Sequence, residues 1–253
     1  MRLRPGFISS AAGKVYNPNW TPNDLANVLA WYDFSDVDTL FQDSSRTTPV
    51  TAEDQYILGV TNKAQDAYHL VGSGATQPQY KLNTQNGLSS AYLLATSLLK
   101  ATSLVLGLNS FLVGMSYVPI GNDNGTGRPF GASDGGGSFE TIFADYTSVQ
   151  RTWTNGQWSY FGSLAETVRS TATKAIIDIP EDGISAYPRV NKGGTDHIGS
   201  VVVPAADAYK DFHLGQLVSY GFYGHYLEVV FCSSMTASEE TALNAYLAAK
   251  WDV

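Results

Sequence analysis

Turn signals recur at short intervals along most of this chain, and their spacing restricts the possible fold more than any other feature. Segments rich in Gly, Asn, Asp and Ser lie at 43–49, 72–74, 86–87, 121–127, 131–137, 155–156, 181–183 and 192–194. Between them lie β-rich runs such as FLVGMSYVPI, ETIFADY, KAIIDI, HIGSVVV, FHLGQLVSY and HYLEVVFC. Many short strands separated by frequent turns predict an all-β, antiparallel two-sheet sandwich.

One hairpin can be predicted residue by residue. The Asn-Gly pair at 155–156 favours a two-residue turn, because both central positions of that turn need positive φ. The resulting register sets Trp153 opposite Trp158 and Arg151 opposite Tyr160, with all four on one face. These four are the candidate ligand- or partner-binding residues. The alternative is packing in the core or between subunits, but a buried face tolerates Trp far better than an unpaired Arg.

The run Tyr226–Cys232 alternates like a strand that has one apolar face. Leu227, Val229 and Phe231 are expected on that face, with Glu228 on the other. The second face is therefore either less buried or supplies Glu228 with a partner.

Near the C-terminus the period changes from two to that of a helix. Thr236 followed by Glu239 is a capping box, and acidic residues lie at the start and Lys250 at the end of the segment. The apolar stripe of this helix comprises Leu243, Tyr246, Leu247 and Trp251. We expect this stripe to pack on the sandwich as a lid. A shorter helix is expected after Thr21, where Pro follows a potential cap.

Residues 1–23 are interpreted as an extended arm and residues 24–253 as the sandwich with its helix. The arm holds three positive charges before Asp24, which leaves −11 for the rest of a chain whose net charge is −8. The candidate assembly residues are Arg2, Arg4, Phe7, Ile8, Tyr16 and Trp20. A solvated tail gains nothing from the apolar members, so we expect the arm to lie on another copy of the chain and to form a trimer.

Composition narrows the range of partners. The acidic body argues against nucleic acid, and we see neither a signal peptide nor an apolar run long enough to span a membrane. A single cysteine, Cys232, excludes an internal disulfide. Charged residues make up only 15% of the chain, which is typical of exterior β proteins. This combination favours a protein assembled into a particle in the cytoplasm before release.

Catalytic patterns are mostly missing from the sequence. GASDG at 131–135 matches a nucleophile motif, but a run of glycines follows Ser133 where that motif needs a helix. No Glu-x-Asp or Glu-x-Glu spacing offers paired carboxylates on one strand. The four histidines are scattered, so no metal or cofactor is expected, although Asp123 and Asp134 sit on loops that suit calcium as well as turns. The sequence predicts no catalytic residue and a non-enzymatic protein.

Two segments resemble a known family. Residues 29–70 contain W-x-D-x-S-D-x-x-T-L from Trp31 and D-S-x-x-T-x-P-V from Asp43. The end of the chain, 225–251, reads HYLEVVFCSSMTASEETALNAYLAAKW, with FHLGQ at 212–216 before it. These segments resemble the first and last parts of concanavalin-A-like (laminin-G-like) jelly-roll domains of phage and bacterial surface proteins. The chain departs from that pattern at 61–64, where TNKA replaces a phrase that usually contains Trp.

The resemblance implies a jelly roll and brings no catalytic residues with it. Its members include lectins, adhesins, hydrolases and virion proteins, so the fold leaves the function open. The first expectation is a bacteriophage virion structural protein of the head or tail that assembles with copies of itself and with other virion proteins. The alternative is a carbohydrate-binding adhesin or receptor-binding module that contacts a surface glycan.

Overall fold

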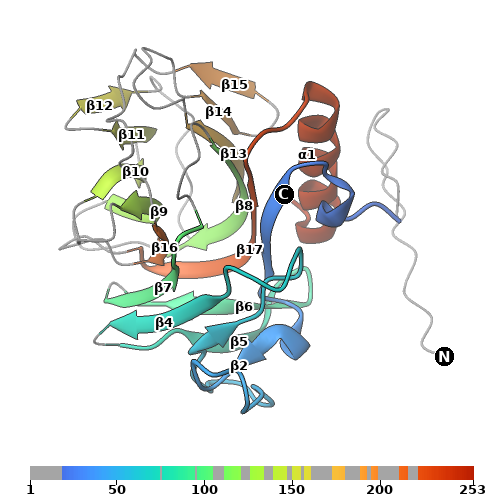
Figure 1. The fold of residues 1–253 in the computed structure, drawn as a ribbon, viewed down its shortest axis with the longest axis vertical. Coiled ribbons are helices and arrows are strands. Elements are labelled where there is room, and N and C mark those ends of the chain that lie inside the picture. Colours follow the sequence, from blue (N-terminus) through green and yellow to red (C-terminus); the bar gives the residue numbers. More distant parts are fainter. Residues whose placement is uncertain are drawn as a thin grey trace.

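The fold is that of a two-layer β-sandwich with one α-helix on its outside, seen here in a computed structural model (Figure 1). The structure describes residues 19–74, 76–94, 96–104, 111–120, 126–133, 139–146, 150–154, 157–160, 173–179, 189–192, 195–198, 211–215 and 222–253. All statements below refer to these ranges. Short 3-10 helices cover Pro22–Asp24 and Val37–Thr39, the first of them where the sequence predicts a helix after Thr21.

Sheet A has eight strands. They are β1 (Val28–Asp33), β5 (Gln79–Gln85), β6 (Leu88–Leu93), β8 (Phe111–Pro119), β13 (Thr173–Ile179), β14 (Arg189–Lys192), β15 (Thr195–Ile198) and β17 (Gly224–Cys232). The order is β15-β14-β13-β8-β17-β6-β5, with β1 also paired to β17. Every pairing is antiparallel, as the sequence predicts.

Sheet B has nine strands. They are β2 (Leu40–Phe41), β3 (Gly59–Val60), β4 (Leu70–Gly74), β7 (Ser97–Ala101), β9 (Thr126–Ser133), β10 (Phe139–Tyr146), β11 (Gln150–Thr154), β12 (Gln157–Tyr160) and β16 (Asp211–Gly215). Their order is β12-β11-β10-β9-β16-β7-β4-β3-β2, again antiparallel. The two sheets confirm the predicted jelly-roll sandwich.

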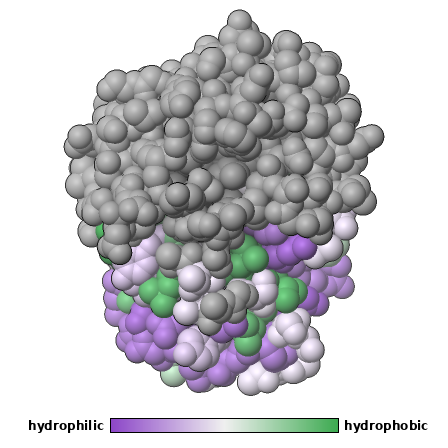
Figure 2. Space-filling model, turned by 90° about the vertical axis from the view of Figure 1, so that its left-hand side faces the viewer, coloured by the Kyte–Doolittle hydropathy of each residue, from purple (hydrophilic) through white to green (hydrophobic). Residues whose placement is uncertain are grey.

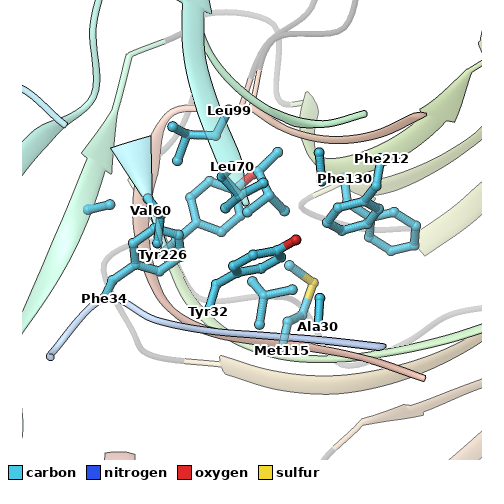
Figure 3. Packing of buried hydrophobic residues seen from close by; sticks show 14 of the residues in the cluster. Ala30, Tyr32, Phe34, Val60, Leu70, Leu99, Met115, Phe130, Phe212 and Tyr226 are labelled. Atoms are coloured by element: carbon cyan, nitrogen blue, oxygen red, sulfur yellow. The ribbon is translucent and has the colours of Figure 1, made fainter. Parts of the chain in front are cut away.

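The main core lies between the sheets and is lined by alternating residues of both (Figure 3). Aromatic rings fill its centre: Phe111 stacks on Phe231 with 4.9 Å between ring centroids, and Phe130 meets Phe212 at 5.8 Å. Residues between these positions along each strand therefore face outward. This alternation allows residues to be assigned to the outer faces of the sandwich.

Helix α1 (Ala237–Trp251) packs on the outer face of sheet A, as the lid prediction requires (Figure 1). Thr236 and Glu239 form the expected capping box, and Trp251 is fully buried. The approach to the sheet is close. A Cβ on Gly114 of β8 would lie 2.6 Å from Cδ2 of Leu243, so the helix needs a glycine at that position.

The predicted face of one residue in β17 is wrong. Val229 and Phe231 point into the core, but Leu227 packs under the helix. A register shift between Tyr226 and Glu228 against β8 interrupts the alternation, so Leu227 and Glu228 both lie on the helix side. The hydrophobic pattern of the sequence does not predict a bulge of this kind.

Candidate functional site

A continuous row of residues crosses the outer face of sheet B. Strand pairing sets His213 of β16 opposite Lys100 of β7 on one side and opposite Gly131 of β9 on the other. Gly131 pairs with Ile142 of β10, which in turn pairs with a tryptophan of β11. The complete row is Lys100, His213, Gly131, Ile142, Trp153 and Trp158, and we call it the sheet B row.

The hairpin that ends this row has the predicted register. Trp153 pairs with Trp158, and Arg151 pairs with Tyr160. The structure describes the backbone of these strands, and the turn at 155–156 lies outside the described residues. A role of the four residues in binding stays a prediction, now with a position at one end of a row that crosses six strands.

Polar side chains lie in and beside the middle of the row. Phe212 and Leu214 flank His213 along β16 and are buried in the core, which assigns His213 to the outer face. Asp211, two residues earlier, lies on that same face. Its carboxylate accepts a hydrogen bond from Ser103 N (2.8 Å) and lies 2.5 Å from Lys100 Nζ.

The electrostatics of this group leave one ion pair and one neutral ring. Burial opposes ionisation of Asp211, but Lys100 and the Ser103 amide outweigh it and lower the pKa of Asp211. Burial, with help from the charge of Lys100, lowers the pKa of His213 to about 4. At neutral pH the imidazole is therefore uncharged, with one nitrogen that donates and one that accepts hydrogen bonds. Asp211 and His213 are themselves buried, at 4% and 6% exposure, and Lys100 is partly exposed.

The described part of this side of the molecule is mixed in character. Figure 2 shows apolar residues in green gathered among hydrophilic residues in purple. Val71 of β4, which pairs with Lys100, is among the exposed large apolar residues, at 38% exposure. The described residues at this end of the sheet B row thus combine an exposed apolar side chain with a partly exposed lysine.

A second cluster of charged residues lies beneath helix α1. Glu228 of β17 pairs across strands with Asp33 of β1, and Lys250 Nζ bridges them at 2.9 Å and 2.8 Å. Lys63 Nζ adds contacts to Asp33 at 3.2 Å and to Asp36 at 2.5 Å. We call Asp33, Lys63, Glu228 and Lys250 the ionic cluster.

Glu228 is also held by three uncharged donors. Trp31 Nε1 and Tyr246 OH donate to Oε1 at 2.6 Å and 2.8 Å, and Trp251 Nε1 donates to Oε2 at 2.8 Å. The carboxylate is fully buried. It therefore has the partner that the sequence left open, and no solvent-borne substrate reaches it.

Charge balance in the ionic cluster follows from burial and pairing. Burial raises the pKa of Glu228, and Lys250 partly offsets this. For Asp33, burial is outweighed by Lys250 and Lys63, which lower its pKa. Burial works against the ammonium of Lys250, but the two carboxylates outweigh it and raise its pKa. We interpret the cluster as the structural attachment of the helix to sheet A.

Sequence reasoning found Glu228 but missed its partners. Asp33 and Lys250 are separated by most of the chain, and no local spacing connects them. Lys63 lies in the TNKA segment that departs from the family pattern, where the side-chain oxygen of Asn62 also accepts a hydrogen bond from Trp31 N at 2.9 Å. The substituted segment thus supports β1 with polar contacts.

Of the predicted assembly residues, only Trp20 is described. Its ring lies 5.5 Å from that of Tyr246 in helix α1 of the same chain. Arg2, Arg4, Phe7, Ile8 and Tyr16 lie outside the described residues, as do Asp123 and Asp134. Assembly through the arm and a trimeric state remain predictions.

Within the described ranges, no helix is long and apolar enough to cross a membrane. Among the same residues, no group of three or more His, Cys, Asp or Glu side chains is placed to hold a metal ion.

Comparison with known proteins identifies the fold. No protein-family model and no curated protein matches the chain significantly. Domain 4 of the family 43 extracellular arabinanase AbnA from Geobacillus stearothermophilus, solved with arabinotriose, superimposes with a TM-score of 0.61 at 13% identity over 86% of this chain and 98% of that domain.

A family 54 α-L-arabinofuranosidase is also similar. A mutant soaked with 4-nitrophenyl α-L-arabinofuranoside gives a TM-score of 0.61 at 13% identity, and a complex with arabinofuranosyl-α-1,2-xylobiose gives 0.59 at 12%. The match covers 90% of this chain and 64% of that enzyme, so the chain spans less than two thirds of it. These likenesses establish the β-sandwich fold.

The prediction of a non-enzymatic protein is contradicted by these neighbours, which belong to glycoside hydrolases. A missing Glu-x-Asp spacing excludes only acids two residues apart on one strand, whereas paired strands bring acids together from distant segments. Asp33 and Glu228 are direct cross-strand partners here.

Proposed function

We propose that this protein is a carbohydrate-binding β-sandwich domain and that the sheet B row is its binding surface. One observation carries the proposal: the register lines up Trp153 and Trp158 with His213 and Lys100 across adjacent strands. Aromatic rings offer apolar faces to sugar rings, and a few fixed polar groups orient the hydroxyls.

The neighbours indicate which sugars to test first. The arabinanase domain was solved with arabinotriose, and the arabinofuranosidase with an arabinofuranosylated xylobiose. Arabinofuranose-containing oligosaccharides are therefore the primary probes. The bacteriophage virion assignment draws no support from these neighbours and stays a prediction.

Binding is tested by titrating arabinotriose and longer arabino-oligosaccharides into the protein by calorimetry. We expect Trp153→Ala and Trp158→Ala to weaken binding at least tenfold. Thr152→Ala is the matched control, because Thr152 neighbours Trp153 on β11 and alternation assigns it to the opposite face. Unchanged affinity in both Trp variants, with unchanged thermal melting, would rule out this surface.

Glycoside hydrolysis is a second candidate, favoured by acids on two strands of the same sheet that have one strand between them. Asp211 of β16 pairs with Ser133 of β9, and Ser133 pairs with Phe139, the residue before Glu140 on β10. Two strand spacings separate the backbones of β16 and β10 by roughly 9–10 Å, of the same order as the carboxyl separation of inverting glycosidases. Glu140 lies at a register shift between β10 and β9. Lys100 and the Ser103 amide lower the pKa of Asp211, which keeps its carboxylate ionised, as the base of such a pair must be.

Hydrolysis is measured by release of nitrophenol from 4-nitrophenyl α-L-arabinofuranoside and of reducing ends from arabinan. Activity that falls at least a hundredfold in both Asp211→Asn and Glu140→Gln would establish this candidate. Activity that survives both substitutions would place the chemistry elsewhere. Binding without turnover would leave the carbohydrate-binding function alone.

A further inference from the structure

The outer face of sheet A is only partly covered by helix α1. The helix ends over one end of the β5–β6 hairpin, where Gln85 Nε2 donates to the carbonyl of Trp251 and Asn86 Nδ2 donates to that of Lys250. The other end of the same strands carries Tyr92, which is half-buried. This part of the face is therefore reachable from solvent.

Three rings gather on the uncovered half. Tyr92 of β6 lies opposite His225 of β17, with ring centroids 4.9 Å apart. Tyr223 meets Tyr92 edge-on at 5.7 Å, and all three side chains are partly exposed. We call Tyr92, Tyr223 and His225 the aromatic platform.

Strand pairing extends the platform sideways. Tyr92 pairs with Gln79 of β5, and Gln79 forms a β-bridge with Tyr56. Tyr56 is 54% exposed, the largest exposure among the described large hydrophobic residues. The row from His225 to Tyr56 crosses three strands and a loop, a width that suits several sugar units more than a single small molecule.

Polar groups around the rings are balanced in charge. Lys81 Nζ lies 5.8 Å from the ring centre of Tyr92 and is paired with Asp54. Ser90 Oγ lies 2.8 Å from Nδ1 of His225. Burial, with the nearby charge of Lys81, lowers the pKa of His225 to about 4, so the ring is neutral at pH 7.

We propose that the aromatic platform, with Lys81 and Tyr56 at its edge, is a second carbohydrate-binding surface. Apolar ring faces, phenol and imidazole groups that donate and accept, and a neutralised lysine together match an uncharged polyol better than an anion or a peptide terminus. The surface lies on the opposite side of the sandwich from the sheet B row. Two such surfaces make one chain bivalent and able to crosslink a polysaccharide.

This second surface rests on the proposed function only for the class of its ligand, because its residues are different from those of the sheet B row. Calorimetry with arabinotriose, xylotriose and cellotriose gives the number of sites per chain. We expect two sites in the unmodified protein for the preferred sugar. Tyr92→Ala and Tyr223→Ala should each leave one site, with the affinity of that site changed less than twofold.

Matched variants separate the two surfaces and exclude misfolding. Leu82→Ala removes an exposed apolar side chain from β5 and should leave two sites. Tyr92→Phe keeps the ring and should keep the second site, with affinity reduced about threefold to tenfold for the lost hydroxyl. Both Tyr92 variants are compared by thermal melting, and a melting temperature near that of Leu82→Ala shows that the fold is intact.

Each outcome decides between the proposals. Two sites that persist in Tyr92→Ala and Tyr223→Ala, or a single site that only Trp158→Ala removes, would overturn the second surface and leave the proposed function standing. A single site that only Tyr92→Ala removes would support the aromatic platform and overturn the sheet B row. No binding of any of the three sugars by the unmodified protein would overturn both.

Discussion

The two halves of the outer face of sheet A carry similar side chains, but helix α1 covers only one of them. The covered half has Trp31, Trp251 and Tyr246 around the buried carboxylate of Glu228. The open half has the aromatic platform beside the Lys81–Asp54 ion pair. Both combine rings with paired charges, but only the covered half has a helix packed over it.

The difference shows what the helix contributes. Beneath α1, each polar atom of Glu228 has a defined donor, so the indoles and the phenol act as hydrogen-bonding partners within the fold. On the open half, Tyr92, Tyr223 and His225 are partly exposed to solvent. A buried network stabilises one arrangement, whereas an exposed one is free to bind, and the following experiments test that division.

Removing the largest side chain of the covered half should have the largest effect. Trp251 is fully buried, so Trp251→Ala leaves a cavity and also removes a donor to Glu228. We expect a loss of about 3–5 kcal/mol in the free energy of unfolding. Urea titration followed by circular dichroism measures it, and a loss below about 1 kcal/mol would show that the helix is not an integral part of the fold.

Trp251→Phe separates packing from hydrogen bonding at the same position. The phenyl ring keeps much of the apolar contact but cannot donate to Oε2 of Glu228. The unfolding free energy should fall by about 1–3 kcal/mol, the cost of a weakened partner set around a buried carboxylate. If the Phe variant is as unstable as Trp251→Ala, the lost hydrogen bond and not the packing accounts for the role of Trp251.

A pH titration tests the open half. The pKa of His225 is about 4 in the folded chain, against an ordinary value of 6.5. Between these two values the unfolded chain binds a proton that the folded chain does not bind. Stability should therefore fall as pH decreases from about 6.5 to about 4. His213 has the same sign of shift and adds to the slope. His225→Gln should flatten the melting-temperature profile in this window, and an unchanged slope would contradict the assignment.

Local sequence patterns predicted those parts of the fold that depend on near neighbours. The turn at 155–156 predicted the pairing of Trp153 with Trp158, and the capping box predicted where the helix begins. The apolar stripe predicted the buried face of the helix, including Leu247 and Trp251. Each of these features depends on residues that are close together in the sequence.

Features that depend on tertiary pairing were not predictable in this way. The ionic cluster brings together Asp33, Lys63, Glu228 and Lys250 from three separate elements and a loop, so no local spacing in the sequence predicts it. The aromatic platform was missed for the same reason, because Tyr92 and His225 become neighbours only when β6 pairs with β17. The bulge at Leu227 comes from the pairing of β17 with β8.

The smallest stability effect is expected on the open half, at Tyr92. Removing its hydroxyl in Tyr92→Phe takes away a group that is partly exposed and is bonded to Tyr223, itself partly exposed. Solvent replaces that hydrogen bond, so the unfolding free energy should change by about 0.5 kcal/mol or less. Tyr226→Phe is the matched control, because Tyr226 is fully buried and its hydroxyl accepts a hydrogen bond from Gly215 N at 3.0 Å. That variant leaves a buried amide without its acceptor and should lose about 1–3 kcal/mol. Equal losses in the two variants would mean that the open half is as integral to the fold as the interior, and the basis for a free binding surface there would be lost.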